Sequence, residues 1–286
     1  MVSVPIFLRF GPGGISERSA KRDSLAGIER VRQVGLSCME LEFVRRVSMG
    51  EEKASRVKAL AQKLDVSLSV HAPYYINLNA ADREILEASK KRLVLAARIG
   101  ALCGAAGIAF HAGSYMGETP ARALRTIKKH LRDVRRILLS EGNKILLWPE
   151  SAGRHTQFGT TTELIELCGE TEGTAPCIDF AHLHAAAGGA LKYDGFATAL
   201  EQVRSGLGAG ALSNLHMHVS GIRYGKKGEL EHINLDESDF DYQSLLLALR
   251  DFSVGGRLIC ESRDREADAL LLKQMYESLE RKGAAG

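Results

Sequence analysis

Residue types that bind metal ions recur in this sequence at one kind of position, the end of a short apolar segment. A single histidine or carboxylate in such a place usually faces solvent or forms a structural hydrogen bond, so one example carries little information. Here the pattern occurs repeatedly, as Val70-His71, Phe110-His111, Pro149-Glu150, Ile178-Asp179, Met217-His218 and Cys260-Glu261. If the segments are strands whose ends converge, these side chains meet and form a metal site rich in histidine and carboxylate.

Glu150 indicates why a metal is expected there. It follows the apolar segment Ile145-Leu146-Leu147-Trp148, where a carboxylate is costly unless it is paired or bound to a cation. The other segment ends offer histidines and acids rather than Lys or Arg, which favours a metal ion over an ion pair as the counter-charge.

Histidines near these ends extend the set. His182 follows Asp179 by three residues, and His232 lies in what is expected to be a long loop after His218. His216 and His218 share one face of their segment because side chains of a strand alternate. Of the two, His218 is preferred as a ligand because it is nearer the end.

Eight candidate strands and the segments between them supply the framework. The strands are expected at residues 6–10, 38–43, 67–71, 107–111, 145–150, 175–179, 213–219 and 257–261. The connecting segments have apolar residues at helical spacing, most clearly Leu124, Ile127, Leu131, Val134 and Leu138. This alternation predicts an α/β fold, a single (β/α)8 TIM barrel domain over residues 1–286 with its site at the C-terminal ends of the strands. An open doubly wound sheet would need a Gly-rich phosphate-binding turn that Gly11-Pro12-Gly13-Gly14 does not match.

The composition excludes several other classes of protein. The chain has 45% hydrophobic and 26% charged residues and a net charge of +3, which is too small to argue for or against nucleic acid. Its five cysteines are widely spread and form no CxxC pair, so neither a disulfide framework nor a cysteine zinc site is indicated. No apolar run approaches the roughly 20 residues that span a bilayer, and no secretory pattern is visible at the N-terminus. A cytoplasmic protein with no membrane contact is expected.

The candidate ligands are too many for one zinc ion, which takes about four. They comprise five histidines and three carboxylates: His71, His111, His182, His218, His232, Glu150, Asp179 and Glu261. Two or three ions bridged by a carboxylate accommodate such a set. Clusters of this kind activate a water and bind a phosphate.

The ordered set resembles the endonuclease IV family. The resemblance lies in His71 with Tyr74 and Ile76-Asn77-Leu78, His111-Ala112-Gly113, Glu150-Ser151-Ala152-Gly153, Cys177-Ile178-Asp179 with His182 and Ala186-Ala187-Gly188, and then His218, His232 and Glu261. It implies an apurinic/apyrimidinic (AP) endonuclease with a barrel fold and three zinc ions. The implied first site is His71, His111 and Glu150, and Glu150 bridges to a second completed by Asp179, His218 and Glu261.

The third site departs from the family's pattern. His182 and His232 resemble two of its ligands, but Leu230 occupies the position of the expected Asp two residues before the last histidine. Glu229 and Glu231 flank it, and a shifted loop would let one of them substitute. The participation of His184 and His216 is also left open. The expected cofactor is therefore two or three Zn²⁺ ions, with Mn²⁺ as the alternative metal.

Basic and aromatic residues in the predicted loops suit damaged double-stranded DNA as the partner. Arg223, Lys226 and Lys227 are expected to contact the phosphate backbone. Tyr74 and Asn77 are further candidates for the substrate site, and an aromatic ring there would fill the gap left by an extruded nucleotide. A basic stripe is interpreted instead as a solvated helix face, because barrel helices face away from the strand ends. It consists of Arg122, Arg125, Lys129, Arg132 and Arg136.

The resulting prediction is a metal-dependent endodeoxyribonuclease that hydrolyses the phosphodiester 5′ to an abasic site, with no obligate protein partner. Glu150, Asp179 and Glu261 are its catalytic carboxylates. One alternative is a metal-dependent sugar isomerase or epimerase of the xylose-isomerase-like barrels, for which Glu40 and Glu42 near the end of the second strand are suited. Another is a non-catalytic protein that binds DNA lesions, which only Leu230 supports.

Overall fold

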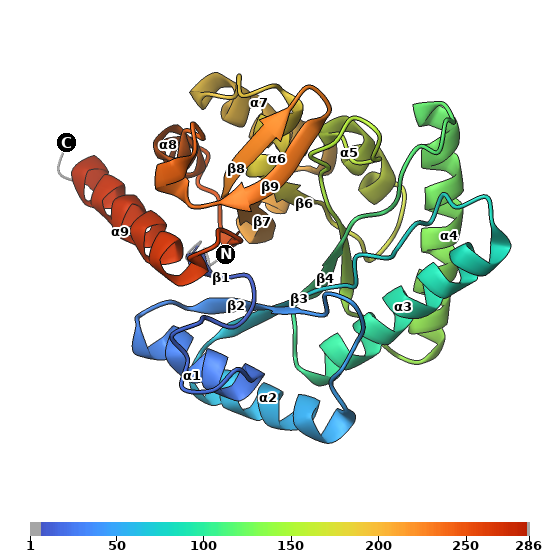
Figure 1. Ribbon diagram of the computed structural model, residues 1–286, viewed down its shortest axis with the longest axis horizontal. Helices are drawn as coiled ribbons and strands as arrows, with labels where there is room; N and C mark the ends of the chain where they lie inside the picture. Colours follow the sequence, from blue (N-terminus) through green and yellow to red (C-terminus); the bar gives the residue numbers. More distant parts are fainter. Residues whose placement is uncertain (1–6, 285–286) are drawn as a thin grey trace.

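Parallel strands alternate with helices along the chain and form the inner ring of the fold (Figure 1). The structure is a computed structural model that describes residues 7–284. The strands of the ring are β1 Leu8–Pro12, β2 Cys38–Glu42, β3 Ser67–His71, β4 Gly107–Phe110, β5 Leu146–Pro149, β6 Cys177–Asp179, β7 Leu215–Val219 and β10 Gly256–Cys260. The predicted TIM barrel architecture is confirmed.

The ring closes through two weaker junctions. One run of paired strands has the order β1-β10-β7-β6, and the other has the order β2-β3-β4-β5. A parallel bridge between Gly13 and Glu40 joins β1 to β2, and one between Glu150 and Cys177 joins β5 to β6. All strand ends on one side of the ring therefore face a common space, which is the condition for the predicted site.

Strand boundaries differ from the prediction by one or two residues, which is the usual uncertainty of element ends. Residue 6 of the first predicted strand lies outside the described residues, and that strand continues to Pro12. Residues 213 and 214 belong to a short helical turn, Ala209–Asn214, rather than to β7.

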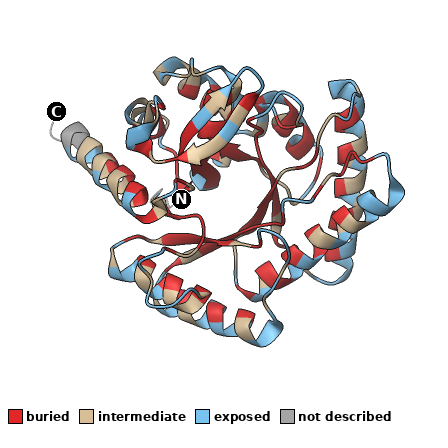
Figure 2. Ribbon diagram, in the orientation of Figure 1, coloured by how far each residue is buried: buried red, intermediate tan, exposed pale blue. Residues whose placement is uncertain are grey.

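Helices surround the ring with their apolar faces turned inward, as the burial colours of Figure 2 show. They are α1 Ser24–Gln33, α2 Glu51–Lys63, α3 Arg83–Leu102, α4 Pro120–Ser140, α5 Thr161–Gly169, α6 Phe180–Ala186, α7 Tyr193–Leu207, α8 Tyr242–Asp251 and α9 Arg265–Ala284. The apolar stripe predicted for α4 is buried at all five positions. None of the helices within residues 7–284 has the length and hydropathy to cross a membrane.

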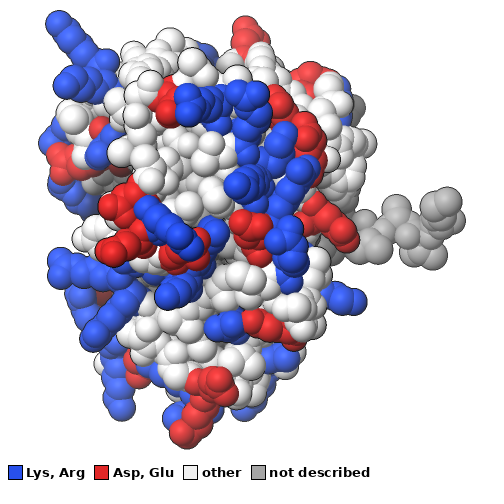
Figure 3. Space-filling model, turned by 90° about the vertical axis from the view of Figure 1, so that its right-hand side faces the viewer, with Lys and Arg blue, Asp and Glu red and all other residues white. Residues whose placement is uncertain are grey.

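The basic stripe of α4 lies on the outside of the molecule, where acidic residues neutralise much of it. Arg122 pairs with Glu118 at 3.3 Å, and Arg136 pairs with Asp133 at 3.0 Å. Figure 3 shows the side of the molecule that carries this helix, with Lys and Arg interleaved with Asp and Glu. This arrangement suits a solvated face rather than a DNA-binding stripe.

The connection between β7 and α8 was expected to be a loop, and that expectation is wrong. It contains two antiparallel strands, β8 Gly221–Gly225 and β9 Gly228–Ile233, joined by a turn at Lys226 and Lys227 (Figure 1). The hairpin is short and mostly polar, so it lacks the apolar run by which the barrel strands are recognised. His232 consequently lies on a paired strand, opposite Ile222.

Candidate metal centre

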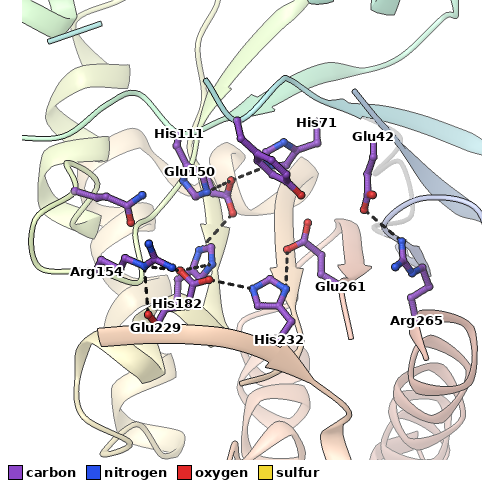
Figure 4. A pocket seen from close by; sticks show the side chains of 12 residues that line it. Glu42, His71, His111, Glu150, Arg154, His182, Glu229, His232, Glu261 and Arg265 are labelled. Carbon is purple, nitrogen blue, oxygen red and sulfur yellow. Dashed lines mark hydrogen bonds and ion pairs between the residues drawn. The ribbon is translucent and has the colours of Figure 1, made fainter. Parts of the chain in front are cut away.

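Side chains from the carboxyl ends of the strands and from the β8–β9 hairpin converge on a cavity of about 420 Å³ (Figure 4). Groups of potential ligand atoms there lie within 4.8 Å of one another. Zinc ligands lie about 2.0–2.3 Å from the ion, so atoms at this separation are close enough to share one. The groups include His71 with His111 and Glu150, and Glu150 with Asp179, His218 and Glu261.

Glu150 is the residue common to these two groups. One carboxylate oxygen lies 3.1 Å from His71 Nε2 and the other 3.1 Å from His218 Nδ1. The first oxygen is also 3.6 Å from His111 Nε2. Because its side chain is only 1% exposed, this carboxylate depends on the surrounding cations or imidazoles for stabilisation.

The carboxylates draw positive charge into the cavity. Burial by itself lowers the pKa of a histidine, but the hydrogen bond to Glu150 and its charge raise the pKa of His71 to about 10. Against the same opposing effect of burial, Asp179 and Glu150 raise the pKa of His182 to about 9. Metal ions satisfy the same demand for positive charge by replacing protons on the imidazoles.

Among the buried ligand-type atoms that have no hydrogen-bond partner within the described residues, two lie where the ligand groups meet, which fits a metal as their partner. They are Oδ2 of Asp179 and Nε2 of His232. Asp179 Oδ2 lies 3.2 Å from His182 Nδ1 without forming a hydrogen bond to it. Unpaired buried polar atoms are rare in proteins, and these two lie where the ligand groups meet.

Leu230 occupies the position of the expected Asp, and the β8–β9 hairpin places its two acidic neighbours, Glu229 and Glu231, in different surroundings. Leu230 is 59% exposed and faces away from the cavity lining. Glu231 is bound to Arg223 and, at 2.8 Å, to Arg263. Glu229 instead points into the cavity, with its oxygens 3.6 Å from His182 Nε2 and 3.8 Å from His232 Nε2. Of the two acidic residues beside Leu230, Glu229 is therefore the one near the two histidines, which also form a group of potential ligands with Asp179.

Gly153 makes room for this arrangement. A Cβ atom at Gly153 would lie 2.8 Å from the Glu229 Cβ and 2.9 Å from His182 Cδ2, closer than such atoms approach. The backbone N–H of Glu229 donates to Gly153 O at 2.9 Å, which ties the hairpin to the loop after β5. The motif Glu150-Ser151-Ala152-Gly153 thus contributes to both sides of the site.

The residues whose participation was left open lie in different places. His184 is fully buried outside the cavity, with Nε2 3.1 Å from Asp239. His216 does not line the cavity, but it forms a further group of potential ligands with Cys177 and His218, and its Nε2 is 2.9 Å from Glu40. Glu40 is also fully buried, whereas Glu42 lines the cavity 3.6 Å from Arg265.

The five residues predicted for substrate binding do not form one group. Tyr74 lines the cavity. Asn77 does not line it, and its carboxamide oxygen accepts from the Asn79 backbone N–H at 3.0 Å. Arg223 is engaged by Glu231, while Lys226 and Lys227 are exposed at the hairpin turn.

Sequence reasoning missed two polar residues of the cavity wall, Gln157 and Arg265. Gln157 lies in the loop that follows the Glu150 motif. Arg265 begins α9, four residues after Glu261, where its Nη1 donates to Gly13 O at 2.5 Å. The position of both in loops at strand ends was the available signal, but each is separated from the nearest apolar segment by residues of no special type.

Comparison with known proteins identifies the family of this chain. A family model described as xylose isomerase-like TIM barrel matches residues 28–282, so the chain belongs to that family. An uncharacterized protein of Methanocaldococcus jannaschii is 38% identical over 275 residues, covering 96% of this chain and 98% of its own. A probable endonuclease 4 of Mycobacterium tuberculosis is 27% identical over 212 residues, covering 72% and 77%.

Solved structures with the same fold include an endonuclease and an epimerase-like protein. Endonuclease IV from Thermus thermophilus superposes with a TM-score of 0.72 at 18% identity, covering 95% of this chain and 99% of that one. A D-tagatose 3-epimerase-like protein superposes with a TM-score of 0.72 at 17% identity and the same coverage. The predicted resemblance to endonuclease IV is thus confirmed, and the epimerase-like structure shares the fold.

Proposed function

We propose that the protein is a metal-dependent endonuclease that hydrolyses the phosphodiester 5′ to an abasic site in double-stranded DNA. The observation that carries the proposal is Glu150, whose carboxylate belongs to two groups of potential ligands at once. A carboxylate shared in this way suits a cluster of ions, and such clusters are suited to phosphodiester hydrolysis. The similarity to a probable endonuclease 4 supports the same choice.

The residues present fit two or three ions, with zinc as the expected metal. His71, His111 and Glu150 would hold the first, and Glu150, Asp179, His218 and Glu261 the second. His182, His232 and Glu229 would hold the third. When bound, the ions supply a water-derived nucleophile at neutral pH and charge to neutralise phosphate oxygens.

The chain's own residues would bind and orient the substrate around this centre. Arg154 and Arg265 line opposite sides of the cavity (Figure 4), where their guanidinium groups are suited to phosphate oxygens. Each is held by a carboxylate, Arg154 by Glu229 at 3.8 Å and Arg265 by Glu42 at 3.6 Å. Tyr74 offers an exposed ring beside the cavity for stacking.

The loops around the cavity have the composition of a nucleic-acid surface. Large apolar or aromatic side chains are exposed there at Val44, Tyr74, Tyr75, Met116 and Leu230. Exposed cations lie in the same connections, at Arg45, Arg46, Arg154, Arg223, Lys226, Lys227 and Arg263. Aromatic platforms beside cations bind nucleic acid by stacking and by contacts to phosphates. A free sugar would leave this surface without a role.

A sugar isomerase or epimerase is the second candidate, favoured by the equal superposition of an epimerase-like structure. Glu40 does not suit the role of its acid or base, because it is fully buried and both its oxygens face imidazoles. Glu42 remains suited to that role, since it lines the cavity. A non-catalytic lesion-binding protein is less well supported, because Glu229 supplies the carboxylate that Leu230 lacks.

The test is incision of a duplex oligonucleotide that carries one abasic-site analogue. We expect one cut 5′ to the lesion by the wild-type protein, none by Glu150→Gln or Glu261→Gln, and normal cutting by Glu231→Gln, whose carboxylate faces away from the cavity. Metal content is measured on the same samples. Absence of incision by a metal-loaded protein that converts ketoses would instead establish the isomerase.

A further inference from the structure

A carboxylate that no step of the proposed reaction uses lies beneath the metal centre. Glu40 projects from β2 into the barrel interior and is 0% exposed. Its two oxygens face two different imidazoles: Oε2 is hydrogen-bonded to His216 Nε2 at 2.9 Å, and Oε1 lies 2.9 Å from His218 Nε2 but has no aligned hydrogen bond. A buried carboxylate without such partners would be strongly unfavourable. Both imidazoles are thus candidates to donate an N–H to it.

His218 has different surroundings at its two nitrogens. Nδ1 lies 3.1 Å from Glu150 and 3.7 Å from Glu261, on the side of the metal centre. Nε2 faces Glu40 on the opposite side. A neutral imidazole carries one N–H, and a nitrogen that binds a metal must be the unprotonated one. If Nδ1 binds the metal, the proton is on Nε2 and is donated to Glu40.

His216 is hydrogen-bonded to the other oxygen of Glu40, and Trp148 holds its ring in place. Its ring stacks on Trp148 with the centroids 4.3 Å apart and an interplanar angle of 19°. Its Nε2 lies 3.2 Å from the Nε2 of His218. The two Nε2 atoms are within hydrogen-bonding distance of each other, and His216 Nε2 is also hydrogen-bonded to Oε2 of Glu40. Oε1 of Glu40 has no hydrogen-bond partner among the described residues, which leaves it free to accept an N–H from His218 Nε2 at 2.9 Å.

We propose that Glu40 is the positioning residue of the metal centre, which holds His218 with its proton on Nε2 and its Nδ1 directed at the ions. His216 and Trp148 support Glu40 in turn. Carboxylates that accept from the second nitrogen of a metal-binding histidine fix its orientation and increase its basicity. The inference rests on the proposed metal centre, but it holds whether the substrate is DNA or a sugar.

The test compares Glu40→Gln with the wild-type protein in chelator competition and in ¹⁵N NMR of labelled histidine. A Gln side chain has only one acceptor oxygen, so it cannot accept both N–H groups. We expect one ion to bind about 10–100-fold more weakly and the Nε2–H signature of His218 to be lost. Glu42→Gln, two residues further along β2, is the matched control and should keep that signature, because Glu42 faces Arg265 instead.

A second variant covers the case in which Glu40→Gln does not fold. His216→Asn leaves Glu40 in place but removes one donor, so we expect a smaller loss of affinity for the same ion. Wild-type affinity in whichever variants fold, or a proton on Nδ1 of His218 in the zinc-loaded wild type, would overturn the proposal. Loss of an ion in Cys177→Ser would also overturn it, because Cys177, His216 and His218 would then hold an ion of their own. A wild-type protein that binds no ions would contradict the proposed function as well, whereas unchanged variants of a metal-loaded protein contradict only the role of Glu40.

Discussion

The barrel strands and the β8–β9 hairpin both direct candidate ligands into one cavity, but they hold them in different ways. On the strands, Glu150 and Asp179 have side chains that are each 1% exposed, within a ring closed by pairing on both sides. On the hairpin, Glu229 and His232 are 19% and 25% exposed, and the two strands pair with each other and, outside the pair, through a single bridge between Gly228 and Arg154. The ring fixes where a ligand stands along its strand, whereas the hairpin allows a neighbouring residue to take over.

The departure of Glu229 from the family's pattern illustrates this difference. The strand-borne ligands occupy the expected positions, because a shift by one residue would turn each side chain to the other face of its strand. The pairing of the hairpin skips Leu230, because Arg223 lies opposite Glu231 and Tyr224 lies opposite Glu229, so the register shifts by one residue there. Attachment to Gly153 then determines that Glu229, and not Glu231, faces His182.

Glu150→Gln tests the ligands at the ends of the barrel strands, and we expect it to reduce incision and metal content more than any other variant. It removes the negative charge shared by two ligand groups, so we expect loss of incision by about 1000-fold or more and loss of metal from both groups. Single-turnover kinetics and metal analysis measure the two effects. Retention of both ions with only a small loss of rate would show that Glu150 does not bridge them.

Glu229→Gln tests the candidate ligands on the β8–β9 hairpin, and we expect it to reduce incision less than Glu150→Gln does. We expect loss of a single ion and incision reduced by about 10–100-fold, with the strand-borne ions kept. Glu231→Gln is the matched control, because it lies two residues away on the same strand and pairs with Arg223 and Arg263 outside the cavity. Equal behaviour of the two variants would contradict the assignment of Glu229.

The pH dependence of the stability of the metal-free protein tests His71, a candidate ligand at the end of a barrel strand. His71, with a pKa near 10 in the fold against an ordinary value of 6.5, contributes stability that is fully present below pH 6.5 and declines as the pH rises towards 10. We therefore expect the urea midpoint of chelator-treated protein to fall between pH 6.5 and 9, and to fall less in His71→Asn. Zinc-loaded protein should not show this fall, since its imidazoles are already deprotonated. A metal-free midpoint that rises over this range would refute the explanation.

Leu230→Asp should have the smallest effect. It restores the residue type that the family's pattern expects, but the side chain at this position is 59% exposed and does not line the cavity. We expect unchanged metal content in the single variant and no rescue in the Glu229→Gln/Leu230→Asp double variant. Recovery of the lost ion in the double variant would mean that the hairpin shifts its register easily.

Much of the site was predictable because its ligands follow apolar segments. His71, His111, Asp179 and His218 each end or directly follow a segment whose apolar residues are visible in the sequence, and parallel strands in a barrel bring such ends together. The hairpin was not predictable in the same way, because Gly228–Ile233 contains too few apolar residues to be distinguished from a loop. Glu40 was predicted to lie at the end of the second strand, but it lies two residues before Glu42, the last residue of β2.

The sequence by itself determined the barrel and the kind of centre, since strand–helix alternation and the residue types at the strand ends are local properties. Only the tertiary structure decided which of Glu229 and Glu231 faces the cavity, because that depends on a bulge and on contact with Gly153, some 75 positions away in the chain. It also decided that the two oxygens of Glu40 face two imidazoles in the barrel interior. That contact joins β2 to β7 across the barrel interior, where residues 176 positions apart meet.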